Sequence, residues 1–445
     1  MSGSVASHWL FGDIDAFARA PHLFPWRNAE QGGGLGSFRV LRRHVLTTCD
    51  PKTAQHVFST RRDIWQRAAQ ARTLGIVIGD GLLATEGPLW KTRHAMIQPL
   101  LRRGEMAALA PVVQRAAARR LEDWETRRKS GAPVAIVAET QRLAMEVMAE
   151  KLLSIQIEPD FGVRFGAAMR EALLLLRERN TSIFPAPMWA PTPRNRRLLA
   201  CRRELDDFVG AHVDTRIAAD APTRDDLLGA LIAARDAGSG QGLNRSALLN
   251  EAKTLFVAGY ETTATTLTWT LLLLAQHPDV AAKLRAELEA VLGGRSPEWA
   301  DLPRLTYTLQ VVNEAMRVYP VVYNLARQCT EDDEIEGRPI PRGSIMLISV
   351  YGVHRSAEWG EDVESFRPER FAQDANWPRR AFLPFGSGEH VCIGTHFAYT
   401  ELLMSLAMIA QRFRLFRADD APVETSPRIT LAPKREIFLR LEPLA

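Results

Sequence analysis

Apolar residues recur at helical spacing along most of the chain. Four segments place them three and four positions apart, which predicts amphipathic helices over residues 107–129, 137–155, 161–178 and 195–218. A longer apolar pattern begins at Asn244, a residue suited to a helix N-cap, and continues until His277–Asp279. Counted as Asn244–Gln276, it contains 33 residues. It therefore predicts a helix roughly 50 Å long, whose centre must be buried.

Shorter patterns complete the outline. Helical spacing returns at residues 280–292, 305–319 and 395–413, and strand-like runs occur at 38–48, as a small hairpin, and at 343–354. Four prolines between Ser182 and Arg197 predict a loop between two helices. The sequence has no internal repeat and no linker. We expect a mainly α fold with a minor β part, forming one large domain over residues 1–445 with 1–37 as an N-terminal segment.

Composition narrows the class of protein. With 46% hydrophobic and 24% charged residues the chain is globular, and a net charge of +4 is a mild excess for 445 residues. We therefore expect no nucleic-acid binding, but a locally basic face for an acidic partner. The four cysteines are far apart, which excludes a disulfide framework and favours a cytoplasmic location. The N-terminus has no signal peptide, and the most apolar window, Thr263–Ala275, is too short to span a membrane.

One cysteine stands in a glycine-rich loop, FGSGEHVCIG, at residues 385–394. Cys392 precedes an apolar helix, whose N-terminal N–H groups and dipole favour a thiolate. The loop glycines allow φ > 0 and a close approach to a large flat ligand. A soft thiolate in such a setting suits haem iron, and His390 is placed to reach an anionic group on the same ligand. The alternative at this point is a buried, inert cysteine beside a turn.

The centre of the long helix contains residues that are costly there. Glycine is unfavourable inside a helix, and a buried glutamate needs a partner. We expect the Thr262 hydroxyl to bond the Ala258 carbonyl and bend the helix. Gly259, Glu261 and Thr262 thus predict a polar notch suited to O₂ binding and proton delivery. The alternative is a lone exposed acid on a helix face.

Glu314 and Arg317 lie three positions apart on one predicted helix, and Arg370 follows in FRPERF. Arg370 is placed to join Glu314 and Arg317 as a third charge. The alternative for Glu314 and Arg317 is an ordinary surface ion pair, which contributes little to stability.

Taken in their order along the chain, these motifs resemble the cytochrome P450 family over roughly residues 40–440. Phe385, Gly388, His390, Cys392 and Gly394 match its Phe-x-x-Gly-x-Arg/His-x-Cys-x-Gly loop. Ala258–Thr263 matches its Ala/Gly-Gly-x-Asp/Glu-Thr-Thr motif, and Glu314, Arg317 and Arg370 match its Glu-x-x-Arg and Pro-Glu-Arg-Phe motifs. The resemblance implies a P450 fold with haem b between the long central helix and the helix that follows the cysteine.

The resemblance also implies roles for individual residues. Cys392 is expected as the axial ligand of the haem iron, and Glu261 and Thr262 as the acid–alcohol pair of oxygen activation. Glu314, Arg317 and Arg370 are expected as a buried structural triad that braces the cysteine loop. Trp90 and His94 match a Trp-x-x-x-Arg/His pattern, with Arg93 one position early and therefore expected at the surface. The remaining haem-binding residues that the resemblance implies are Ala258, Arg327, Phe385, Gly388, His390 and Gly394.

The implied reaction is insertion of one oxygen atom from O₂ into a lipophilic substrate, such as a fatty acid or terpenoid. Electrons are expected from a separate ferredoxin and its reductase, docked on Lys91, Arg93, Arg102 and Arg103, with the enzyme a monomer without a transmembrane anchor. The alternative for that surface is an ordinary solvated face. Two alternatives for the function stay open: a thiolate-haem peroxygenase, isomerase or dehydratase, and a non-enzymatic haem sensor.

Overall fold

A computed structural model describes residues 13–40, 43–68, 73–182, 184–218 and 225–444. Helices dominate this part of the chain, as the apolar spacing predicts. The helices are α1 (Ile14–Arg19), α2 (Phe24–Gln31), α3 (Pro51–Gln55), α4 (Gly75–Ile78), α5 (Gly87–Ile97), α6 (Ala110–Lys129), α7 (Ile136–Leu153), α8 (Pro159–Thr181), α9 (Pro193–Ala218), α10 (Leu227–Ala233), α11 (Arg245–Gln276), α12 (Pro278–Leu292), α13 (Thr306–Val318), α14 (Val350–Val353) and α15 (Thr395–Ala410).

The strands are short and fall into small sheets. The largest sheet has the order β1-β2-β8-β5-β3, in which β2 and β8 are parallel and the other pairs antiparallel. The bounds are β1 (Leu35–Val40), β2 (Arg43–Thr48), β3 (Trp65–Arg67), β4 (Val134–Ala135), β5 (Asn324–Cys329), β6 (Asp333–Ile335), β7 (Arg338–Ile340), β8 (Ile345–Ser349), β9 (Phe413–Arg417), β10 (Thr425–Pro427), β11 (Leu431–Pro433) and β12 (Phe438–Pro443).

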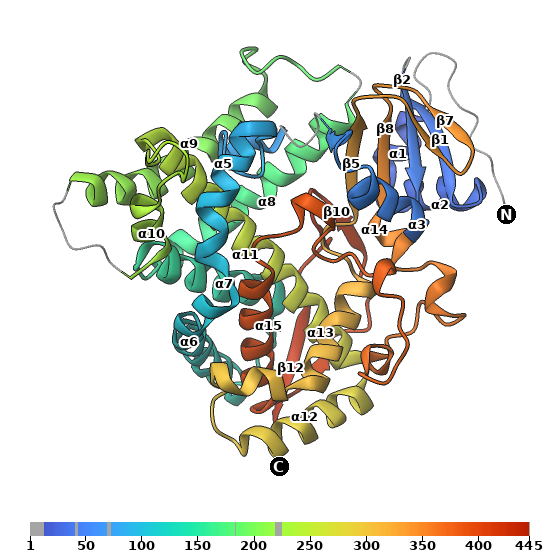
Figure 1. Ribbon diagram of the computed structural model, residues 1–445. Helices are drawn as coiled ribbons and strands as arrows, with labels where there is room; N and C mark the ends of the chain where they lie inside the picture. The colour runs from blue at the N-terminus through green and yellow to red at the C-terminus, as the bar shows by residue number, and fades with distance from the viewer. Residues whose placement is uncertain (1–12, 41–42, 69–72, 183, 219–224, 445) are drawn as a thin grey trace.

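The long helix α11 organises the molecule. It contains 32 residues, and the Asn244 side chain caps it by accepting a hydrogen bond from the Ala247 N–H at 2.9 Å, as predicted. Figure 1 shows α11 running through the centre, with α7, α13 and α15 against it and the five-stranded sheet to one side near the N-terminus. No helix among the described residues is both long and apolar enough to cross a membrane. The window Thr263–Ala275 is a core helix segment, also as predicted.

Several boundaries differ from the prediction for local reasons. The hairpin begins at Leu35, and its first strand is longer than the apolar pattern indicates. The predicted strand at 343–354 ends at Ser349, because the Ser349 hydroxyl caps the short helix α14. The helix predicted to reach Phe413 ends at Ala410, and Phe413 opens β9 instead. The predicted loop ends early, since α9 accepts Pro193 in its first turn.

Two apolar clusters form the core. The larger cluster joins the helices around α11, and the smaller one lies against the five-stranded sheet. Phe385 and Ile393 pack against the larger cluster, and Gly388 lies against Phe58 of the smaller one, so residues 385–394 contact both.

Candidate functional site

The cysteine loop, residues 385–394, is held at both ends by backbone hydrogen bonds. The Cys392 N–H donates to the Phe385 carbonyl at 3.0 Å, and the Thr395 hydroxyl donates to the Cys392 carbonyl at 2.8 Å. Gly386 and Gly388 have φ values of 71° and 75°, the left-handed region that favours glycine. A side chain on Gly388 would overlap the Phe58 carbonyl oxygen, so this glycine permits a close approach of two backbone segments.

Gly394 differs from these two glycines. Its φ is −86°, which any residue adopts, and a Cβ there would only reach ordinary contact with the Cys392 sulfur, at 3.8 Å. The expectation that all three glycines supply unusual backbone geometry is therefore wrong for Gly394. Its small size matters instead for the space beside the sulfur.

The pKa of the Cys392 thiol is raised above its ordinary value. Although the residue is partly accessible, surrounding protein atoms desolvate the thiol and raise its pKa, and this outweighs hydrogen bonds from the Gly394 N–H and Thr395 hydroxyl that lower it. The N–H group at the start of the helix lowers the pKa of the thiol, as expected, but desolvation has the larger effect in the protein without a cation. A bound metal ion would supply the missing stabilisation, because metal binding releases the proton of a cysteine ligand.

A basic cluster lies beside the loop, formed by Arg67, Trp90, His94, Arg327 and His390. The Trp90 ring lies 4.1 Å from the His390 ring and 4.7 Å from the His94 ring, measured between centroids. Trp90 Nε1 and His390 Nδ1 are buried with no hydrogen-bond partner among the described residues. Buried polar atoms of this kind normally have partners. Trp90 Nε1 is a donor, and His390 Nδ1 is one when the imidazole is protonated, so their arrangement fits an anionic group of a ligand.

Arg67 and Arg327 bring two guanidinium groups to this cluster. They are paired across strands β3 and β5, and burial, followed by the charge of Arg67, lowers the pKa of Arg327 to about 10. Arg67 also donates to the carbonyl oxygens of Leu82, Leu83 and Thr85. The sequence offered no signal for Arg67, because only the pairing of two distant strands places it next to Arg327.

Glu86 is the acid of the cluster. Its Oε1 lies 3.0 Å from His390 Nε2, and its pKa is lowered because bonding to His390 and the charge of Arg67 outweigh burial, which raises it. One nitrogen of His390 is thus engaged with protein, and the other is free for a ligand.

The central helix has one partly accessible stripe in a buried region. The positions are Leu255, Ala258, Gly259 and Thr262, which repeat every three or four residues and so share a face. The Thr262 hydroxyl donates to the Ala258 carbonyl at 2.8 Å, as predicted. The structural reason for glycine at position 259 differs from the expected polar notch, since a Cβ there would overlap Met148 of α7. It lets α7 cross α11 closely.

Glu261 is buried, not an exposed acid. Its Oε1 accepts from the Thr430 hydroxyl at 3.1 Å, whereas Oε2 has no hydrogen-bond partner among the described residues. Burial raises the pKa of Glu261, and the charges of Arg428 and Arg170 and the bond from Thr430 only partly oppose this. Burial thus shifts Glu261 toward its protonated form.

Comparison with known proteins assigns the chain to a family. A family model described as Cytochrome P450 matches residues 3–440. The chain belongs to the cytochrome P450 family. It is therefore a P450 monooxygenase, with haem held by a thiolate as cofactor.

Relatives of this P450 include two from Streptomyces. Cyclooctatin synthase of Streptomyces melanosporofaciens is 31% identical over 428 residues, covering 95% of this chain and 91% of that protein. Pentalenene oxygenase of Streptomyces avermitilis is 28% identical over 411 residues, covering 92% and 90%. A crystal structure of a cytochrome P450 (CYP102L1) matches with a TM-score of 0.85 and 26% identity, covering 96% of this chain and 99% of that one. The mainly helical P450 fold expected from the sequence is confirmed.

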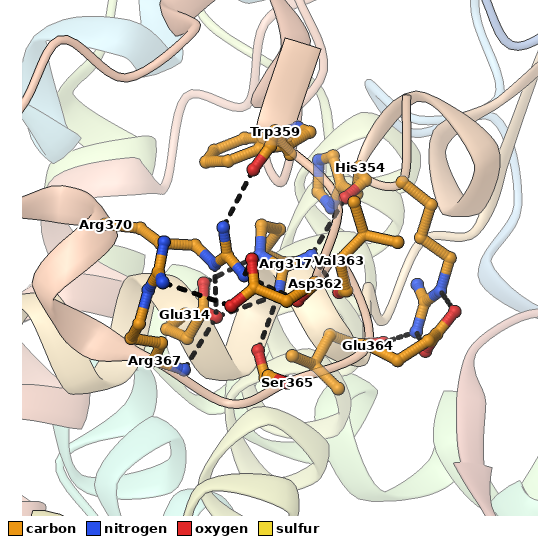
Figure 2. A network of polar contacts seen from close by, with 12 residues as sticks. Glu314, Arg317, His354, Trp359, Asp362, Val363, Glu364, Ser365, Arg367 and Arg370 are labelled. Atoms are coloured by element: carbon orange, nitrogen blue, oxygen red, sulfur yellow. Dashed lines mark hydrogen bonds and ion pairs between the residues drawn. The ribbon is translucent and has the colours of Figure 1, made fainter. Parts of the chain in front are cut away.

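The P450 contains a charge network centred on the buried side chains of Glu314, Arg317 and Arg370 (Figure 2). Arg317 Nε and Nη2 donate to the Glu314 carboxylate at 2.7 and 2.8 Å, and Arg370 Nε lies 3.4 Å from the same carboxylate. Arg317 also donates to the His354 carbonyl, and His354 Nε2 accepts from the Leu383 N–H at 2.8 Å. This chain of contacts connects α13 to a residue just before the cysteine loop. The alternative of a surface ion pair is wrong.

Arg93 is buried, which contradicts its expected surface position. Its Nη1 lies 3.0 Å from Glu251 Oε1, and the other Glu251 oxygen accepts from the Leu82 N–H at 2.9 Å. This contact fixes α5, which carries Trp90 and His94, against α11. Lys91, Arg102 and Arg103 are exposed, so the basic surface expected to dock a partner loses only Arg93.

Proposed function

We propose that Cys392 is the axial ligand of the haem and that the enzyme hydroxylates a lipophilic small molecule. The observation that carries this is the position of one exposed cysteine, Cys392, beside a basic cluster with two buried nitrogens that have no hydrogen-bond partner among the described residues. Haem presents both an iron for the thiolate and two carboxylates for such donors. When bound, thiolate-ligated haem iron supplies activation of O₂ and favours cleavage of its O–O bond.

The residues of this chain then have separate tasks. Trp90, His94, Arg327 and His390, joined by Arg67, would hold the anionic edge of the haem, with Phe385 and Gly388 shaping its thiolate side. Ala258 and Thr262 would line the opposite side, where the accessible stripe of α11 lies. Glu261, whose pKa is raised by burial, would be the acid that carries a proton close to Thr262.

Apolar segments and the relatives support a lipophilic substrate. Val77, Val321 and Leu431 are buried apolar residues, and the Leu431 N–H donates to the Val321 carbonyl at 2.8 Å. Two relatives have names that refer to cyclooctatin and pentalenene. We therefore favour a terpenoid-like, mainly hydrocarbon substrate, to be sought by screening lipophilic compounds for spectral shifts of the ferric protein.

The assignment of Cys392 is tested by substitution. In Cys392→Ser the Soret band of the reduced CO complex should lose its thiolate position, while Cys49→Ser, a partly buried cysteine next to Gly352, should keep it. An unchanged band in Cys392→Ser would refute the assignment. Turnover with a redox chain, compared with turnover with peroxide, separates the monooxygenase from a peroxygenase.

We further propose that a cytoplasmic ferredoxin, reduced by its own reductase, docks on Lys91, Arg102 and Arg103 of the monomeric enzyme. Surface charges of this kind steer association and act strongly at low salt. Arg102→Glu with Arg103→Glu should slow electron transfer at low ionic strength and converge with the wild type at high ionic strength. Equal rates at low ionic strength would exclude this surface.

A further inference from the structure

A small cluster of buried polar side chains lies at α11, in an otherwise apolar core. Glu261 accepts one hydrogen bond, from Thr430, and its second oxygen is unpaired among the described residues. Arg428 is buried, and its Nε and Nη1 are likewise without partners in the described chain. The buried Tyr260 hydroxyl is a fourth such atom. Most buried polar atoms in proteins are paired, so four unpaired ones together require an explanation.

Arg428 and Thr430 belong to the turn between β10 and β11, and this turn is fixed to its surroundings. The Tyr323 hydroxyl donates to the Arg428 carbonyl at 2.6 Å, and Trp269 Nε1 donates to the Leu431 carbonyl at 2.9 Å. Since Glu261 and Trp269 are both on α11, the turn contacts that helix at two points about 12 Å apart along its axis. The turn therefore has a defined position relative to Glu261.

The charges around Glu261 come from two elements. Arg428 belongs to the turn, and Arg170 belongs to α8, where it also bonds Gln141. The remaining titratable neighbour is Tyr260, whose own pKa is raised well above its ordinary value by burial. Both arginines lower the pKa of Glu261, although burial raises it more. Burial thus shifts Glu261 toward its protonated form, while the nearby charge of Arg428 favours its carboxylate.

Building on the proposed function, we propose that Thr430 and Arg428 are positioning residues for Glu261 in proton delivery. Thr430 fixes the orientation of the carboxyl group through its hydroxyl. When Glu261 gives up its proton, the unpaired N–H groups of Arg428 hold the resulting carboxylate, and a proton from solvent later restores the acid. The turn thereby takes part in the reaction without touching the reacting atoms.

The first test is independent of haem and of turnover. Infrared difference spectra against Glu261→Gln isolate the C=O stretch of the protonated Glu261 carboxyl. Thr430→Val should move this stretch to higher frequency, because it loses a hydrogen bond, and Thr430→Ser should restore it. Arg428→Met should raise the pH at which the stretch disappears, and Arg428→Lys should restore part of the shift. Thr425→Val, on the same hairpin but bonded to His22, should change neither property.

The second test measures coupling in the haem-loaded enzyme. Thr430→Val and Arg428→Met should lower the product formed per electron pair about tenfold, with Thr430→Ser close to the wild type. If Thr430→Val does not fold, Arg428→Lys and Arg428→Met carry the comparison. Unchanged infrared and coupling values with a lowered thermal midpoint would overturn the proposal and leave a structural role for the turn. A missing thiolate band in the wild type would instead refute the proposed function, and the infrared result would still stand.

Discussion

Two buried arginines, Arg317 and Arg428, differ in how completely their donors are used. A guanidinium group has five N–H donors. Arg317 makes five hydrogen bonds: two to Glu314 and one each to the carbonyls of His354, Val363 and Ser365 (Figure 2). Arg428, by contrast, has two nitrogens without partners in the described chain, next to an acid that also has a free oxygen.

The difference separates a structural network from a functional one. An arginine whose donors are all used in a low-dielectric interior is rigid and fixes one arrangement of the segments that it joins. Glu314 further accepts from the Arg367 N–H at 2.9 Å, which joins α13 to the segment that leads to the cysteine loop. In the cluster around Glu261, by contrast, two donor nitrogens of Arg428 and one oxygen of Glu261 have no hydrogen-bond partner among the described residues. Proton transfer requires such groups, because they can form new hydrogen bonds when the proton moves. The same residue types thus hold a loop in one region and serve chemistry in the other.

Removing Arg317 should have the largest effect on stability. In Arg317→Met the buried Glu314 carboxylate keeps the Arg367 N–H and the charge of Arg370 but loses its closest charged partner, and loss of one partner of a buried pair costs about 3–5 kcal/mol. We expect a markedly lower thermal midpoint and loss of haem. Lys283→Met, which removes an exposed ion pair to Glu369 of the neighbouring segment, is the control and should change neither. Arg428→Met should be milder than Arg317→Met; equal losses in both would erase the distinction between the two regions.

Sequence reasoning succeeded where neighbours in space are neighbours in the chain. The N-cap of α11, the bond from Thr262 to Ala258, and the spacing of Glu314 and Arg317 all depend on helical periodicity. The helices were likewise predictable, because their apolar faces repeat every three to four residues.

Sequence reasoning failed where the partner is remote. Arg93 stands one position early in its motif, which predicts a surface position, but it is buried against Glu251. That partner lies 158 positions away, and nothing local indicates their contact. Thr430 and Glu261 are separated by 169 positions. Local sequence gives the cost of a buried glutamate but does not identify the residue that offsets it. The N–H groups that lower the pKa of Cys392 are local and were expected, whereas the desolvation that raises it depends on the whole surroundings.

The glycines of the cysteine loop provide a second, smaller test. Gly388→Ala places a side chain at φ 75° and against the Phe58 carbonyl, which as backbone cannot rotate away. We expect a loss of roughly 2–3 kcal/mol and a perturbed loop. Gly394→Ala should leave the thermal midpoint nearly unchanged, because its backbone is ordinary, but should alter the Soret spectrum through the Cβ beside the Cys392 sulfur. The opposite order of stabilities would show that the loop is not braced against Phe58.

The smallest expected effect is a pH dependence of stability that distinguishes Glu261 from acids in paired networks. Burial raises the folded-state pKa of Glu261, so the folded protein retains a proton that the unfolded chain loses from about pH 4.3 upward. Its contribution to stability is present below that pH and is lost as pH rises through the folded pKa. Relative to Glu261→Gln, the wild type should therefore lose thermal midpoint with increasing pH.

Asp226 provides the control of opposite sign. Burial raises its pKa, but bonds from Arg216, Ser154 and the Gly229 N–H lower it further, so the folded-state pKa is depressed. Its contribution is present at higher pH and is lost as pH falls through that lowered value. The difference in thermal midpoint between wild type and Asp226→Asn should thus shrink on acidification, whereas the corresponding difference for Glu261→Gln moves the other way. If the two differences in thermal midpoint changed with pH in the same direction, Glu261 would be ionised in the folded protein. The contrast between Asp226, whose oxygens are paired, and Glu261, which has an oxygen unpaired in the described chain, would then no longer hold.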